Sequence, residues 1–248
     1  DVVSTPETEE EAGTPADKEA ADKLGGEGNP PPISDNKWAN VPVAVQRLLT
    51  DIQAAADLPY LWVMGSIIAQ REASFIPTAH NTSQKEVDGS RDGLKNGLSR
   101  GNPRPKFAAE IEKFGSGGYF GALSPYFAWI GLDAGFMPFL NRRPELVFDA
   151  KASGVFLAHY YYRITSPNYV KNRTMDMFDV RVGWASPSLL KNDPFGTYAQ
   201  GVRKRMRESI AAIGWDEEWI KSLPVVRARY KGIQAVSAKF GFDPKQAD

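Results

Sequence analysis

The chain has 248 residues, of which 42% are hydrophobic, so it is long enough to bury the core of one sizeable domain. It has no cysteine and two histidines, which excludes disulfides and cysteine-ligated metal and argues against a zinc site or a serine–histidine–aspartate triad. No stretch approaches the roughly 18–20 consecutive apolar residues of a membrane span. The net charge is zero, but residues 1–38 carry ten acidic side chains and three lysines, so the rest has an excess of seven positive charges.

Residues 1–37 are rich in Glu, Asp, Ala, Gly and Pro. This segment ends shortly after three consecutive prolines, Pro30, Pro31 and Pro32. This composition predicts an acidic linker with a stiff polyproline spacer, or an arm that becomes ordered on a protein partner. The folded body is expected to begin at residue 38 and to run to residue 213, followed by a helical extension over 214–248 that packs on it.

The body is predicted to be mainly helical, with minor strands. Residues 41–56 have the apolar spacing of an amphipathic helix, and a more apolar helix follows Pro59. Residues 80–118 are polar and contain many glycines, which predicts a long functional loop around a short helix near 105–114. Further helices are expected at 144–165, 174–186, 195–213, 215–222 and 224–240.

Glu72 stands near the end of the apolar helix, on which Leu61, Met64 and Phe75 fall near one face. Such a helix is buried, and desolvation and the negative end of the helix dipole then both favour the neutral acid. A carboxylic acid that stays protonated near neutral pH can act as a general acid at a glycosidic oxygen. In the alternative, structural interpretation Glu72 caps the helix or pairs with Arg71 or a distant arginine.

Five segments form an ordered set of motifs: Arg71–Ala79, Gly121–Ser124, Phe148–Leu157, Gly183–Pro187 and Thr197–Val202. The first resembles the Gln-Glu-Ser-x-Phe-x-Pro-x-Ala segment of the soluble (SLT) type of lytic transglycosylases, which belong to the lysozyme superfamily. The second stands where that family has a Gly-Leu-Met-Gln turn, and the third resembles the helix that follows it. The last two resemble an altered Ala-Tyr-Asn-x-Gly-Pro motif and the closing Asn-Tyr-Val helix.

The resemblance covers about residues 59–207 and implies a lysozyme-like helical domain that cleaves peptidoglycan without a cofactor. In the family a single glutamate, here Glu72, protonates the bond between N-acetylmuramic acid and N-acetylglucosamine. It then acts as a base while the C6 hydroxyl closes on C1 to give a 1,6-anhydro product. The substrate's acetamido and hydroxyl groups make a second carboxylate unnecessary.

Tyr198 or Trp184 is expected to fix the side chain of Glu72. The sequence departs from the family at Ser124, Trp184 and Ala185, which replace Gln, Tyr and Asn, so the groups that would orient the glycan differ while the acid is kept. The expected substrate-binding residues are Ser74, Tyr119, Gly121, Leu123, Ser124, Tyr126, Trp184 and Tyr198.

Two other functions stay open. Asp88 or Asp92 would position a water in an inverting, goose-type muramidase, in which the two carboxylates lie about 6.5–9.5 Å apart, unless both are solvated turn residues. Alternatively, the same scaffold serves as a non-catalytic structural or glycan-binding component of a virion or envelope assembly, tethered by its N-terminal tail. Nucleic acid is disfavoured as a partner, because the residues of the basic run 203–207 splay around a helix axis. Peptidoglycan as substrate predicts a phage virion or tail, or the bacterial periplasm or cell envelope, as the location.

Overall fold

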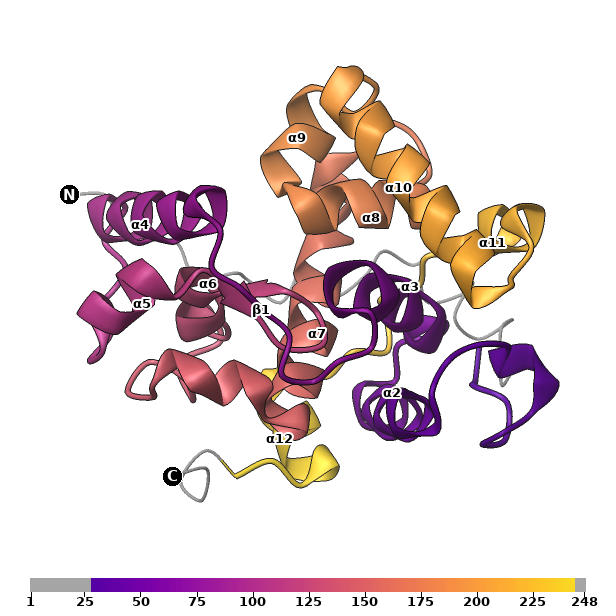
Figure 1. Ribbon diagram of the computed structural model, residues 1–248, viewed down its shortest axis with the longest axis horizontal. Coiled ribbons are helices and arrows are strands. Elements are labelled where there is room, and N and C mark those ends of the chain that lie inside the picture. Colours follow the sequence, from indigo (N-terminus) through magenta and orange to yellow (C-terminus); the bar gives the residue numbers. More distant parts are fainter. Residues whose placement is uncertain (1–27, 244–248) are drawn as a thin grey trace.

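The computed structural model describes residues 28–243, so most of the predicted acidic linker and residues 244–248 lie outside the described residues. The described part is mainly helical with little β-structure, as predicted (Figure 1). The α-helices are α2 (Val43–Ala56), α3 (Leu61–Ala73), α4 (Gln84–Ser99), α5 (Ala108–Phe114), α6 (Ser124–Trp129), α7 (Ala150–Ile164), α8 (Met177–Ala185), α9 (Pro187–Asn192), α10 (Thr197–Ile213), α11 (Glu217–Ser222) and α12 (Ile233–Phe240). Short 3-10 helices occupy Asn36–Trp38, Pro144–Phe148 and Pro167–Tyr169.

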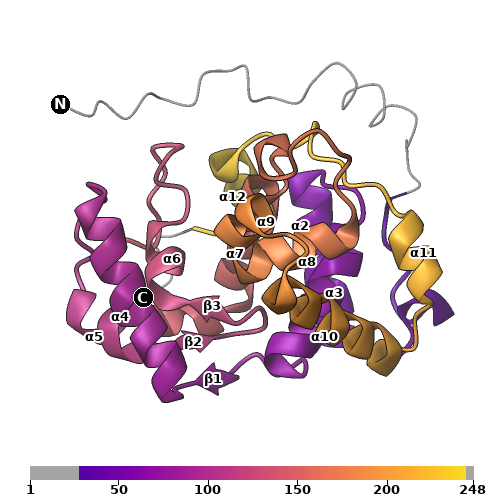
Figure 2. The ribbon, with the colours of Figure 1, turned by 90° about the horizontal axis from the view of Figure 1, so that it is seen from above.

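Three very short strands form one antiparallel sheet in the order β1 (His80–Asn81), β2 (Ser116–Gly117) and β3 (Ala122–Leu123). His80 pairs with Gly117, and Ser116 pairs with Leu123. Helix α7 lies in the middle of the molecule, with α4, α5 and α6 on one side and α2, α3, α8 and α10 on the other (Figures 1 and 2). The sheet follows directly after α3 and brings the β2–β3 turn back beside the end of that helix.

Helix α3 is buried on almost every side, as its composition predicts. It packs against α2, α7, α8 and α10, and Leu61, Met64 and Ile67 are fully buried. The helix ends because Ser74 and Phe75 both adopt left-handed backbone conformations, with φ of 47° and 63°. The last turn therefore stands on a rigid, closely packed element and ends sharply before the sheet.

The prediction of a long loop over residues 80–118 is wrong for the first half of this segment, where α4 forms a regular helix. Gly89, Gly93 and Gly97 stand four residues apart and therefore share one face of α4. That face contacts β3 and α6 so closely that a Cβ on Gly97 would lie 2.0 Å from the Trp129 indole. The glycines thus allow close helix packing and are not the sign of a loop.

The folded body begins earlier than expected, because residues 28–37 pack on it and are not a free spacer. The Gln53 amide donates a hydrogen bond to the Gly28 carbonyl at 2.6 Å, inside the core. The indole of Trp38 donates a hydrogen bond to the carbonyl of Pro32 at 3.1 Å, which holds the proline segment against the start of the folded body.

Helices α11 and α12 of the C-terminal extension pack on α2, α7, α8 and α10, and α12 is shorter than expected. Helix α11 matches the predicted range, whereas α12 begins only at Ile233. Gly232, with φ of 94°, immediately precedes α12, and the segment before it runs non-helically along α7. In that segment the hydroxyl of Tyr230 lies 2.7 Å from Nδ1 of the buried His159.

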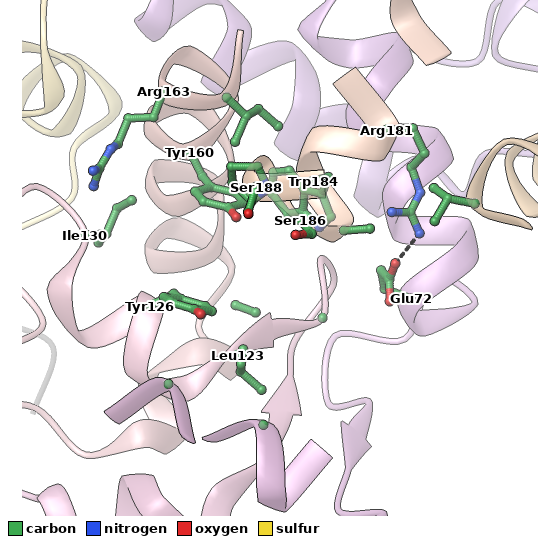
Figure 3. Close-up of a pocket in the computed structure, with 18 of the residues that line it drawn as sticks. Glu72, Leu123, Tyr126, Ile130, Tyr160, Arg163, Arg181, Trp184, Ser186 and Ser188 are labelled. Carbon is green, nitrogen blue, oxygen red and sulfur yellow. Dashed lines mark hydrogen bonds and ion pairs between the residues drawn. The ribbon is translucent and has the colours of Figure 1, made fainter. Parts of the chain in front are cut away.

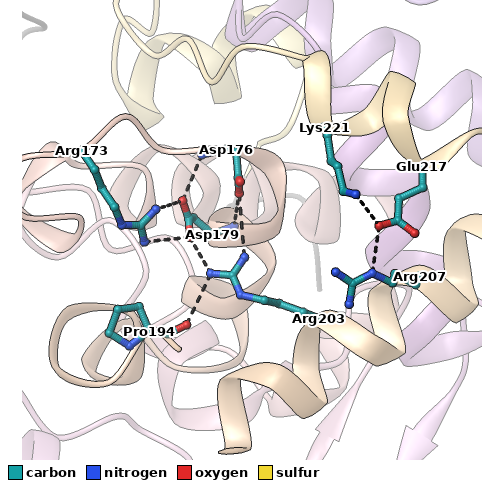
Figure 4. A network of polar contacts seen from close by, with 8 residues as sticks. All are labelled: Arg173, Asp176, Asp179, Pro194, Arg203, Arg207, Glu217 and Lys221. Carbon is teal, nitrogen blue, oxygen red and sulfur yellow. Dashed lines mark hydrogen bonds and ion pairs between the residues drawn. The ribbon is translucent and has the colours of Figure 1, made fainter. Parts of the chain in front are cut away.

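A buried ion-pair network joins the start of α8 to α10 (Figure 4). Asp179 is fully buried and accepts hydrogen bonds from Arg173 at 2.5 and 2.8 Å and from Arg203 at 2.7 Å. Burial would raise the pKa of Asp179, but the hydrogen bonds from both arginines outweigh it and lower that pKa below its usual value. Asp179 also accepts a backbone hydrogen bond from Asp176 in a capping box that begins α8.

We expect Asp179→Asn to lower the free energy of unfolding by about 3–5 kcal/mol, because it leaves the buried guanidinium of Arg203 and the partly buried one of Arg173 facing a neutral amide. Urea denaturation measures this loss. The matched control is Glu218→Gln, since Glu218 is 79% exposed and pairs with Lys221 at the surface; it should change stability by less than about 1 kcal/mol. A loss for Asp179→Asn no larger than that of the control would contradict the prediction.

His159 should make the protein less stable as the pH falls. Burial, with a smaller contribution from Arg163, lowers the pKa of His159 from 6.5 to about 3. The unfolded chain therefore binds this proton near pH 6.5 while the folded protein does not, so stability falls between pH 6.5 and about 3. We expect the unfolding free energy of His159→Gln to vary less steeply with pH between pH 6.5 and 4.5 than that of the wild type. Identical slopes in urea titrations would show that His159 is not the group responsible.

Candidate active-site groove

A groove of about 1010 Å³ runs across the molecule beside the end of α3 (Figure 3). One wall is formed by α4 and by residues of β3 and α6, and the other by α7, α8, α9 and the first turns of α10. Figure 3 shows Glu72 at one side of this space with Arg181 above it, while Tyr126 and Ile130 lie towards the other side. The groove therefore contains the residue that the sequence singled out.

Glu72 is not a desolvated acid, contrary to the expectation from the apolar helix. Its side chain is 31% exposed, and its Oε1 accepts a hydrogen bond from Nη2 of Arg181 at 2.5 Å. The last turn of α3 reaches the surface of the groove, so the apolar burial ends one turn before the carboxyl group. Glu72 is held by a cation from α8, which is the distant-arginine pairing considered as the structural alternative.

Gly121 closes the other side of Glu72. It lies in the β2–β3 turn with φ of 58°, and a Cβ at this position would lie 2.8 Å from Cβ and 3.1 Å from Oε2 of Glu72. The turn can approach the glutamate this closely only because residue 121 has no side chain. Glu72 is thus placed between a glycine turn and an arginine.

Arg181 is a groove residue that the motif comparison missed. Its side chain is 5% exposed, and its Nε and Nη1 atoms are buried without a hydrogen-bond partner. Burial lowers the pKa of Arg181, Glu72 opposes that shift, and the nearby Arg71 and Arg205 add to it. An arginine in the otherwise apolar stretch 180–184 of a buried helix is the sequence signal for an acidic partner elsewhere in the chain.

Aromatic side chains line the rest of the groove, among them Tyr126, Trp184 and Tyr198. Tyr126 and Tyr198 are about half exposed, at 49% and 52%. Trp184 is mostly buried and packs edge-on against Tyr160, with ring centroids 4.9 Å apart. Neither Trp184 nor Tyr198 forms a hydrogen bond with Glu72, so the expected fixing of the glutamate by one of them is replaced by Arg181.

Gly121 and Leu123 line the groove, whereas three other predicted binding residues do not. Ser124 is buried and donates a hydrogen bond to the Ile111 carbonyl at 2.8 Å, because it begins α6 with its side chain turned towards α5. Tyr119 is buried in the core, where desolvation raises its pKa. Ser74 ends α3 in a left-handed conformation and lies outside the groove.

Asp88 and Asp92 also lie outside the groove, because they belong to the helix α4 and not to a loop. Asp88 pairs with Arg91 at 3.1 Å on the outer face of that helix, and Asp92 is exposed. Glu86, on the first turn of α4, is the carboxylate that lines this wall instead. A residue two positions away from Asp88 faces the groove because the segment is helical.

Within residues 28–243 no group of three or more His, Cys, Asp or Glu side chains is placed to hold a metal ion. No helix in the same range has the length and hydropathy needed to cross a membrane.

Comparisons with known proteins do not assign the chain to a family: no family model, no curated protein and no solved structure matches it. The resemblance to the lytic transglycosylases therefore rests on the motifs in the sequence.

The contact between Gly121 and Glu72 predicts that Gly121→Ala disturbs the site. Gly135→Ala is the matched control, because Gly135 has a similar φ of 66° but no atom within 4 Å of a Cβ placed there. Both variants place alanine in the left-handed region, so their difference isolates the contact with Glu72. We expect Gly121→Ala to lower the unfolding free energy by about 1–2 kcal/mol more than the control. Equal losses of unfolding free energy for the two variants in urea denaturation would mean that the β2–β3 turn moves away from Glu72 at no cost, and would contradict the prediction.

Proposed function

We propose that the protein is a lytic transglycosylase that cleaves the glycan strands of peptidoglycan, with Glu72 as its acid and base. The observation that carries the proposal is the position of Glu72: the motif glutamate stands at the end of a buried helix, against the glycine turn, in a groove lined by aromatic residues. Aromatic faces such as those of Tyr126 and Tyr198 suit the apolar faces of pyranose rings. Helices with a small antiparallel sheet after the glutamate helix are also what a lysozyme-like domain requires.

In the proposed reaction, protonated Glu72 gives its proton to the glycosidic oxygen while the bond between that oxygen and C1 breaks. The acetamido group of the muramoyl residue supports the positive charge at C1. The C6 hydroxyl then bonds to C1 and returns its proton to Glu72, so the enzyme ends as it began. The products are a 1,6-anhydro-muramoyl end and a free 4-hydroxyl, with no water consumed.

Arg181 has a defined place in this scheme. After the first step Glu72 is a carboxylate, and the hydrogen bond from Arg181 stabilises that form in the position from which it accepts the C6 proton. The same contact opposes the protonated form needed for the first step. Arg181 must therefore leave Glu72, or share it, when the substrate binds.

The Arg181–Glu72 contact also favours a second candidate function, a glycan-binding protein without catalysis. An ion pair of 2.5 Å whose arginine is buried is a common structural device and needs no reaction to explain it. In that case the protein grips glycan strands as part of a virion or envelope assembly. Both candidates place it in the phage particle or the bacterial periplasm and envelope, where peptidoglycan is found.

Glu72→Gln should abolish the release of anhydro-muropeptides from purified sacculi, with a loss of at least about 10³-fold, because the amide cannot donate an acidic proton. Mass spectrometry of the soluble products measures this. Glu86→Gln is the matched control: it removes the other carboxylate that lines the groove, and a single-acid lyase should tolerate it.

The products separate the remaining candidates. If the wild type releases only hydrated, reducing ends and Glu86→Gln is also inactive, the reaction is hydrolysis with Glu86 holding the water. If the wild type and Glu72→Gln bind sacculi equally and neither releases products, the protein is a glycan-binding component and the proposed reaction is wrong.

A further inference from the structure

The groove beside the end of α3 is cationic, although the chain as a whole is neutral. Seven cationic side chains and two carboxylates line it. Only two of these cations, Arg163 and Arg181, have a carboxylate partner within residues 28–243. The other five, which have no such partner in the same range, are Arg71, Lys85, Arg100, Lys191 and Arg205.

The five cations stand on both walls of the groove. Lys85 lies in the first turn of α4 and Arg100 caps its C-terminal end, whereas Lys191 and Arg205 belong to α9 and α10. All but Arg205 are exposed, so an anionic chain in the groove can reach them. Helix α4 has 16 residues and is therefore about 24 Å long, which is the length of about seven residues of extended peptide.

The balancing negative charge stands in the same chain. Residues 1–27, which precede the described part of the chain, carry nine carboxylates and two lysines and have a net charge of −7. Four of these carboxylates fall within five residues, in the acidic run Glu7-Thr8-Glu9-Glu10-Glu11. Carboxylates this close together repel one another, so the acidic run gains more than the rest of the segment from a cationic surface.

The groove is within reach of the acidic run. The carbonyl of Gly28 accepts hydrogen bonds from the Gln53 amide at 2.6 Å and from the N–H of Tyr60 at 2.9 Å, so the described chain begins beside the N-terminal end of α3. The groove lies at the other end of this helix, about 20 Å away, because α3 has 13 residues. Glu11 precedes Gly28 by 17 residues, which can span up to about 55 Å.

We propose that the acidic run of residues 7–11 binds in the groove of its own chain, between the cations of α4 and those of α9 and α10. Its carboxylates pair with the five cations that have no carboxylate partner among residues 28–243, and the bound segment covers Glu72. Any ligand that enters the groove must then displace this segment. This occupancy holds whether the groove serves cleavage or glycan binding.

The acidic run competes well for the groove because it belongs to the same chain. Each surface ion pair contributes little, about 0–1 kcal/mol, so a free peptide of this kind binds weakly. A tether within one chain gives an effective concentration on the order of 1 mM. A segment with a Kd of about 100 µM as a free peptide would therefore fill its own groove about tenfold more often than it leaves it empty.

The test uses the full chain with a neutralised run, which combines Glu7→Gln, Glu9→Gln, Glu10→Gln and Glu11→Gln. A synthetic peptide of residues 4–13 with blocked ends is titrated by calorimetry into this variant and into the wild type. We expect at least about tenfold tighter binding to the neutralised variant at 0.1 M salt, because the groove of the wild type is already filled. At 1 M salt, where charges are screened beyond about 3 Å, the peptide should bind neither protein.

The matched control for the acidic run removes four charges from the part of the segment nearer to Gly28. It combines Asp17→Asn, Glu19→Gln, Asp22→Asn and Glu27→Gln, and it should bind the peptide as weakly as the wild type does. If it binds the peptide as tightly as the neutralised variant, the assignment to residues 7–11 is wrong.

Substitutions in the two walls locate the peptide. In the neutralised background, Arg205→Gln and Lys85→Gln should each weaken peptide binding several-fold. Lys204→Gln is the matched control, because Lys204 is exposed on α10 next to Arg205 and does not line the groove; it should leave the affinity unchanged. The melting temperature of each variant shows that it is folded.

Equal affinities of the peptide for the wild type and the neutralised variant would overturn the proposal, and so would unchanged binding by both wall variants. Self-association of the wild type that the neutralised run abolishes in sedimentation would place the run in the groove of a second copy, and would also overturn it. Equal binding of a single-stranded oligothymidylate by the wild type and the neutralised variant would show that the run does not block the groove.

The same proteins separate this proposal from the proposed function. If the peptide binds as expected but no protein releases peptidoglycan fragments, the proposed reaction is wrong and the occupancy of the groove stands. If the wild type and the neutralised variant release fragments at the same rate and bind the peptide alike, the occupancy is wrong and the proposed reaction stands.

Discussion

The ion pair between Arg181 and Glu72 is the contact on which the rest of the structure depends. It joins two helices that are far apart in the sequence. Helix α3 supplies the carboxylate, and helix α8 supplies a guanidinium that is almost completely buried. Removing either partner leaves the other charge without compensation in or beside the core, which costs about 3–5 kcal/mol for a buried pair. The contact therefore constrains how α3 and α8 pack, and it places a positive and a negative charge side by side at the edge of the groove.

Both helices are held firmly, so the backbones that carry the pair are fixed and only the two side chains are left to move. Helix α3 is rigid because apolar neighbours surround it, and it ends at two residues with left-handed backbone conformations. Helix α8 begins at the buried Asp179, whose two arginine partners tie it to α10 and to the segment before α8. The opposite wall is built differently, since the glycine face of α4 packs closely on β3 and α6. Both walls carry charge, because Lys85, Glu86 and Arg100 from α4 and its C-terminal end also line the groove.

Local patterns in the sequence were sufficient for most of the helices and for the position of Glu72 at the end of a buried one, and insufficient for contacts between distant segments. Apolar periodicity located α2, α7, α8 and α10, since each buries one face or more. The helix α4 was missed because glycine disfavours helix in isolation, and only its fit against Trp129 explains the glycines. The inward direction of the Ser124 side chain was missed for a similar reason. It depends on how the short helix α6 packs against its neighbours. The pairing of Arg181 with Glu72 spans 109 residues, and no local pattern encodes such a contact.

The most direct test of the account is a crystal structure of the Glu72→Gln variant with a bound tetrasaccharide of alternating N-acetylglucosamine and N-acetylmuramic acid. The account predicts that the glycosidic oxygen lies within about 3 Å of the side-chain amide at position 72, as an acid in contact with its target requires. A tetrasaccharide bound away from residue 72 would contradict the account.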